Sequence, residues 1–107
     1  MEVKNTKRTK KYKELRDGLR EQLEFSQKNS KQNLDLVEDY MSFWLTKEML
    51  QEDIEKRGVS VESYNAKGQS IIKKNDSIAE LVKVNAQMLK ILQHLNIEFN
   101  AGDLIEL

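Results

Sequence analysis

Residues 77–95 read SIAELVKVNAQMLKILQHL, and this stretch decides the fold class. Apolar side chains recur in it at steps of three and four residues, the spacing of one helix face and of a heptad seam. It opens with Ser77 and carries Glu80 three residues later, a capping-box pattern in which each side chain satisfies a free backbone N–H. We therefore predict a helix whose seam is formed by Ile78, Leu81, Asn85, Met88, Leu92 and Leu95.

A second helix is predicted over residues 33–57, because Lys56 and Arg57 suit the negative end of a helix dipole and Gly58 suits a left-handed cap. Two apolar seams run along it. One consists of Leu34, Val37, Met41, Trp44 and Leu45, and the other of Leu36, Tyr40, Phe43, Leu50 and Ile54. A helix that buries one face needs one seam, so two seams indicate neighbours on two sides.

The remaining segments are less apolar. Residues 6–26 carry one narrow apolar stripe and predict a first helix, followed by a polar linker. Residues 59–75 form a long connection, for which a short hairpin with its turn at residues 65–68 is one interpretation. Residues 98–107 are acidic and predict a tail outside the core.

These elements predict one all-α domain over residues 1–107, a bundle of about three helices with a long connection between the second and third. Its parts are a basic N-terminal helix (1–26), a helical oligomerisation core (33–97) and an acidic C-terminal tail (98–107). A bundle this small buries a marginal core, and surplus apolar surface marks interfaces. We therefore predict a homo-oligomer that associates through the second and third helices, as a coiled coil. The alternative is that these two helices pair within one chain, with the first helix lying across them.

The predicted oligomerisation residues come from the seams of both helices. They are Leu36, Val37, Tyr40, Met41, Phe43, Trp44, Leu50, Ile54, Ile78, Leu81, Asn85, Met88, Leu92 and Leu95.

Nothing in the sequence predicts catalysis. There is no Cys and only one His, His94, which excludes thiolate sites and leaves no partner for a nucleophile pair. The paired acids Glu38 and Asp39 are adjacent on a helix and diverge by about 100°, so they do not converge on a substrate. We expect no enzyme activity, no cofactor, no metal site and no small-molecule substrate. No apolar run is long enough to cross a membrane, so we expect no membrane partner.

The charge distribution is the most informative functional signal. The net charge is zero, but residues 1–13 hold six basic groups against Glu2 alone. Cations at a helix N-terminus oppose the dipole, so helix stability does not explain them, whereas a phosphate backbone does. The predicted DNA-binding residues are Lys4, Lys7, Arg8, Lys10, Lys11, Lys13, Arg16 and Arg20. The alternative is a solvated basic tail. Lys67, Lys73 and Lys74 form a smaller basic group in the long connection.

The order and spacing of several segments resemble the small terminase subunits of tailed bacteriophages, in particular a short helical group from phages and prophages of Gram-positive bacteria. The similarity covers about residues 14–98 and is carried by residues 36–41, Trp44, Lys47, Leu50, 53–59, 67–69, 74–77, 85–92 and 95–97. The chain differs from many relatives at Asp76, where they have Pro, and in its acidic C-terminal residues.

The resemblance implies a role in packaging double-stranded viral DNA in the cytoplasm of a bacterial host. Small terminase subunits recognise the packaging-start region, oligomerise, commonly as rings, and recruit and regulate the large subunit, which supplies the ATPase and nuclease. The main alternative is a helical adaptor or regulatory protein that binds another protein and no nucleic acid. DNA binding that weakens with salt would discriminate between the two.

Overall fold

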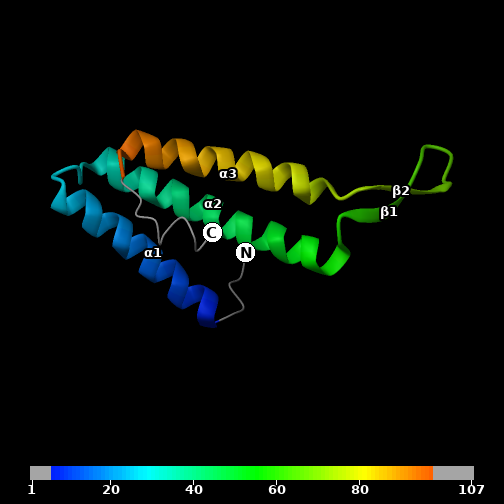
Figure 1. The fold of residues 1–107 in the computed structure, drawn as a ribbon, viewed down its shortest axis with the longest axis horizontal. Helices are drawn as coiled ribbons and strands as arrows, with labels where there is room; N and C mark the ends of the chain where they lie inside the picture. The colour runs from blue at the N-terminus through cyan, green and yellow to red at the C-terminus, as the bar shows by residue number, and fades with distance from the viewer. Residues whose placement is uncertain (1–5, 98–107) are drawn as a thin grey trace. The chain divides into compact units, whose positions relative to one another are not determined.

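The computed structural model describes residues 6–97, while Lys4 and the predicted acidic tail lie outside the described residues. Residues 6–97 contain three helices, as predicted (Figure 1). The connection between the second and third helices is an antiparallel hairpin, so the all-α prediction is corrected to a mainly helical chain with a small sheet. The elements in chain order are α1 (Thr6–Phe25), α2 (Lys31–Arg57), β1 (Ser60–Tyr64), β2 (Ser70–Lys74) and α3 (Asp76–Leu95).

The chain divides into two compact units, each built from parts of several elements. The first unit takes Met1–Met41 and Leu89–Leu107, so its described part holds α1, the beginning of α2 and the end of α3. Its buried apolar residues are Leu23, Val37, Met41, Leu92 and Leu95. The second unit is Ser42–Met88, with Trp44, Val84 and Met88 as its buried apolar residues.

Local capping explains where α1 ends and α2 begins. Gln27 adopts a left-handed conformation (φ 59°), and the Lys28 N–H donates to the Leu23 carbonyl oxygen at 2.7 Å, which closes a Schellman motif. The chain then turns into α2, where the Ser30 hydroxyl accepts a hydrogen bond from the Asn33 N–H at 3.2 Å. Ser30 is therefore the N-cap of α2.

The hairpin lies within the second unit, between the end of α2 and the beginning of α3. Ser60 pairs with Lys74, and Tyr64 pairs with Ser70. Figure 1 shows the hairpin extending beyond the adjoining ends of these two helices. The hairpin interpretation of residues 59–75, with a turn near residues 65–68, is thus confirmed.

The two predicted caps around the hairpin have different outcomes. Gly58 ends α2 in a left-handed conformation (φ 80°), as predicted. The capping box at Ser77 is wrong, because α3 begins two residues earlier than predicted, at Asp76, and Asn75 is its N-cap, accepting the Ser77 N–H at Oδ1 over 3.0 Å. The Ser77 hydroxyl instead donates to Asp53 Oδ2.

Candidate nucleic-acid interface

The basic residues predicted to bind DNA lie along α1. No acidic residue occurs in the first turn of this helix. Lys4 lies outside the described residues, and Lys7 belongs to α1 without a described side chain. The remaining members of the predicted set, all on α1, are Arg8, Lys10, Lys11, Lys13, Arg16 and Arg20.

Two of these cations form weak ion pairs with carboxylates of their own helix. Lys10 Nζ lies 4.0 Å from Glu14 Oε1, and Arg16 Nε lies 3.2 Å from Asp17 Oδ1. The Arg16 guanidinium also lies 5.8 Å from the centroid of the Tyr12 ring, a cation–π distance. Surface ion pairs of this kind contribute about 0–1 kcal/mol, so an incoming phosphate can replace the carboxylates.

Lys11 and Lys13 are the most available cations among the α1 residues whose side chains the structure describes. Both side chains are exposed, and neither has an ion pair among the described residues. Lys13 and Arg16 are three residues apart and share one helix face. This stretch of α1 therefore presents positive charge on more than one face to a polyanion.

Arg20 differs from the rest of the set, because its guanidinium donates to the Glu38 carboxylate of α2. The pair connects two helices of the first unit, and both side chains are partly exposed. The two residues are 18 positions apart, which is why no local pattern in the sequence predicts the pair. Arg20 is thus engaged inside the unit, whereas Lys11 and Lys13 are not.

The predicted oligomerisation residues fall into a buried set and a half-buried set. Val37, Met41, Trp44, Met88, Leu92 and Leu95 are buried within the chain. The second seam of α2 and three positions of the α3 seam stay half-buried: Leu36, Tyr40, Phe43, Leu50, Ile54, Ile78, Leu81 and Asn85. Burial raises the pKa of the Tyr40 hydroxyl. On α3, Val84 is buried beside the half-buried Asn85, and Val82 and Leu89 are exposed.

A polar cluster in the second unit was missed by sequence reasoning. Asp53 of α2 accepts hydrogen bonds from Arg57, Ser77 and Asn75, with distances of 2.7 Å to Arg57 Nε and Ser77 Oγ. The Arg57 hydrogen bond, followed by that of Ser77, holds the pKa of Asp53 well below its usual range. A carboxyl that stays ionised this firmly is a poor general base near neutral pH. The cluster therefore has a structural role and does not indicate catalysis.

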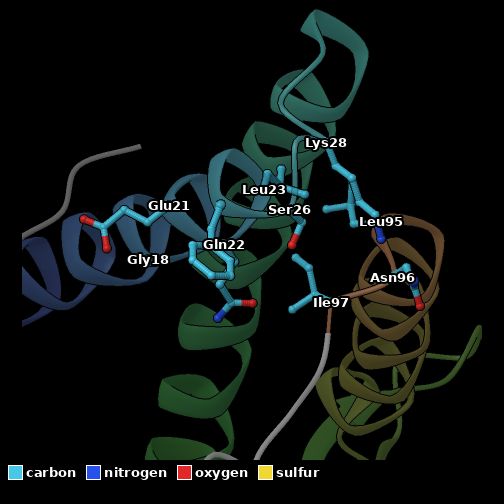
Figure 2. Close-up of a pocket in the computed structure, with 10 residues that line it drawn as sticks. Gly18, Glu21, Gln22, Leu23, Ser26, Lys28, Leu95, Asn96 and Ile97 are labelled. Carbon is cyan, nitrogen blue, oxygen red and sulfur yellow. The ribbon is translucent and has the colours of Figure 1, made fainter.

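A pocket in the first unit lies between the last turns of α1 and the end of α3, as Figure 2 shows. Leu23 and Leu95 contribute buried apolar surface, and Glu21 and Lys28 are its ionisable residues. His94 does not line it. The lining contains no nucleophile with a base beside it, so the pocket offers no catalytic arrangement.

Two classes of site are absent over residues 6–97. No cluster of His, Cys, Asp and Glu there could hold a metal ion. No helix in the same range is long and apolar enough to cross a membrane.

A small, mainly helical chain with a basic first helix is consistent with a binding and assembly protein. Residues 12–98 match the family model described as phage terminase, small subunit. Because this match spans most of the chain, the chain belongs to that family, which confirms the resemblance to phage small terminase subunits. The family is non-catalytic and acts in phage DNA packaging, so the expectation that the chain is not an enzyme is also confirmed. No curated protein and no solved structure matches the chain.

Proposed function

We propose that this chain binds viral double-stranded DNA through α1 and assembles into a homo-oligomer through α2 and α3. In this role it presents the DNA to the large terminase subunit in the cytoplasm of a bacterial host, with a phage or prophage of Gram-positive bacteria as its source. Family membership supports DNA packaging as the process and the large subunit as the partner.

The observation that carries the DNA-binding part is the group of available cations on α1. Lys11 and Lys13 are exposed without ion pairs in the described part of the chain, and Lys10 and Arg16 have only weak surface pairs. Each lysine or arginine that neutralises a phosphate releases a counterion, so the contacts favour DNA of any sequence. In an oligomer every chain adds one such helix, and avidity raises the total affinity.

The apolar surface of α2 and α3 supports the assembly part. Tyr40, Phe43 and Ile54 on the second seam of α2 are half-buried, and Val82 and Leu89 on α3 are exposed. Apolar side chains repeated along two helices are costly to leave in water and favour association with further copies.

DNA affinity measured over a series of salt concentrations tests the DNA-binding part. Lys7, Arg8, Lys10 and Lys11 are replaced by Ala together, and binding to a labelled duplex is compared with that of the parent. We expect a lower slope of log affinity against log salt and weaker binding to all sequences alike. The matched control replaces four exposed lysines elsewhere, Lys31, Lys56, Lys83 and Lys90, and should leave the slope close to that of the parent.

Light scattering coupled to size exclusion tests the assembly part. We expect a mass of several chains at micromolar concentration, and the α1 variant should keep this mass because its substitutions lie outside the seams. A parent mass of one chain would exclude assembly. A parent that binds no DNA at low salt would instead favour the helical adaptor that binds only protein.

A further inference from the structure

The β1–β2 hairpin of the second unit is an exposed element to which the proposed function assigns no role. All residues of β2 are exposed, and β1 alternates between exposed and half-buried positions. Ile72 is 73% exposed and Tyr64 is 67% exposed. Large side chains that are this exposed are available for contact with a partner.

The hairpin presents positive charge that is not neutralised internally. Its one acidic residue, Glu62, already accepts hydrogen bonds from Ser70 Oγ at 2.9 Å and from Tyr64 OH at 3.4 Å. No carboxylate of residues 6–97 lies within ion-pair distance of the ammonium group of Lys67 or Lys74. Both lysines can therefore pair with an anion without breaking an existing pair.

The tip that carries Lys67 is held in one conformation. Asn65 Oδ1 accepts hydrogen bonds from the Lys67 N–H at 2.9 Å and from the Gln69 N–H at 3.0 Å. Gly68 adopts a left-handed conformation (φ 78°), which a residue with a side chain rarely adopts. A tip ordered before binding loses less conformational entropy when it binds.

Hydrogen bonds also hold the base of the hairpin. Asn75 follows β2 directly and is fully buried, and its Nδ2 donates to the Gly58 carbonyl oxygen at 2.9 Å. Its Oδ1 accepts from Arg57 at 3.2 Å. These hydrogen bonds join the base of the hairpin to the ends of α2 and α3. They therefore fix the base of the hairpin in place.

We propose that the β1–β2 hairpin enters the major groove of duplex DNA, with Lys67 and Lys74 on phosphates at its two margins. This inference rests on the proposed function. The major groove is about 12 Å wide and admits a two-stranded β-ribbon. From the base of the hairpin to its turn, the strands span four residue steps, about 14 Å. The separation of Lys74 at the base from Lys67 in the turn is therefore comparable to the width of the groove.

The same register places apolar contacts on one face of the hairpin. Ile72 is opposite Glu62, and Tyr64 is opposite Ser70, so both large side chains lie on the same face. This face can lie against the base edges and sugars inside the groove. The Asn65 amide is engaged in the turn, where its Nδ2 donates to Gln69 Oε1 at 3.0 Å, so it is not available to read bases. The contact therefore adds affinity with little sequence preference.

A second copy of the hairpin is the competing occupant, because both strands have an open edge. Charge favours DNA over this arrangement. Hairpins of neighbouring chains would bring Lys67 and Lys74 of each copy together, whereas phosphates neutralise them.

The test compares a Lys67→Ala/Lys74→Ala variant with the parent in titrations of a short labelled duplex over a salt series. Loss of two phosphate contacts per bound chain should lower the slope by about 1.8 and weaken binding several-fold at moderate salt. The oligomeric mass should not change. A matched control, Lys56→Ala/Lys83→Ala, removes two exposed lysines outside the hairpin and should keep the parent slope. A Tyr64→Ala variant should lose affinity without a change of slope.

Three other results would each contradict the inference, and each points to a different explanation. If the parent binds DNA and the hairpin variant keeps its affinity and slope, the hairpin is not a DNA contact, while the proposed function stands. If the hairpin variant has a smaller oligomeric mass, the hairpin joins copies of the chain. If the parent binds no DNA at low salt, the proposed function fails together with the inference.

Discussion

The Ser77 hydroxyl donates a hydrogen bond to Asp53 Oδ2 over 2.7 Å and so joins the first turn of α3 to the last turns of α2. Arg57 approaches the same carboxylate from within α2, with Nη2 at 2.8 Å from Oδ2. Asn75 completes the group and is fully buried. The two helix ends and the base of the hairpin are therefore held by one polar cluster.

Replacing Asn75 by Ala should be the most destabilising polar substitution in this cluster. It removes the N-cap of α3 and leaves the carbonyl oxygen of the half-buried Gly58 without its Asn75 partner. Loss of a cap costs about 0.5–2 kcal/mol, and an unpaired buried polar group costs about 1–3 kcal/mol. We expect the free energy of unfolding in urea to fall by about 2–3 kcal/mol. Gln87→Ala, an exposed amide on α3, serves as the control, and equal losses in the two variants would contradict the assignment.

Asp53 should make stability depend on pH in the acid range. Its pKa is lower in the folded chain than in the unfolded chain, chiefly because Arg57 and then Ser77 donate hydrogen bonds to the carboxylate. The resulting stabilisation is complete above the unfolded pKa of about 4 and is lost as pH falls below it. Asp53→Asn should therefore be less stable than the parent near neutral pH, and the difference should shrink as pH falls below about 4.

Urea unfolding of both proteins at a series of pH values measures this difference. Asp35→Asn, an exposed aspartate near the start of α2, is the control and should follow the parent at every pH. A difference between the Asp53 variant and the parent that stays constant down to low pH would exclude ionised Asp53 as the source.

The sequence predicted those features that depend on short-range periodicity and local capping. The spacing of apolar residues predicted the three helices, and Gly58 predicted the end of α2. The hairpin was only one interpretation, because β2 reads Ser-Ile-Ile-Lys-Lys and lacks the strict alternation of a half-buried strand.

Features that depend on distant residues could not be predicted in the same way. Asn75, two positions before the predicted cap, competes with Ser77 for the role of N-cap, and Asp53 decides the outcome by accepting the Ser77 hydroxyl. Arg20 looks like the other cations of α1 in the sequence, but Glu38 on another helix engages it. In both cases a partner at least 18 positions away assigns the role.

Asn85 offers a test of the proposed assembly. It is half-buried on α3 beside the buried Val84, and a polar residue on an association seam can select the register and the number of chains at a cost in stability. We expect Asn85→Leu to raise the melting temperature by roughly 4–8 °C, equivalent to about 1 kcal/mol, and to broaden the mass distribution in light scattering. A lower melting temperature together with a single, unchanged oligomer would show that Asn85 has no such role.

Arg20 and Lys13 should differ in their effects on DNA binding although both are cations of α1. Lys13 is exposed and has no ion pair among the described residues, whereas the Arg20 guanidinium is paired with Glu38. Lys13→Gln should lower the salt slope by about 0.9 per bound chain, the effect of one lost phosphate contact. Arg20→Gln should leave the slope nearly unchanged, because its guanidinium is engaged within the first unit.

The stability of the same two variants gives an independent readout. The Arg20–Glu38 pair is partly exposed, with side-chain exposures of 42% and 43%, so its loss should cost no more than about 1 kcal/mol. Arg20→Gln should therefore be slightly less stable in urea than the parent, and Lys13→Gln should match the parent. A double-mutant cycle with Glu38→Gln separates the pair energy from other effects of each substitution. If Arg20→Gln lowers the salt slope as much as Lys13→Gln while the cycle shows no coupling to Glu38, Arg20 binds phosphate and does not hold α1 against α2.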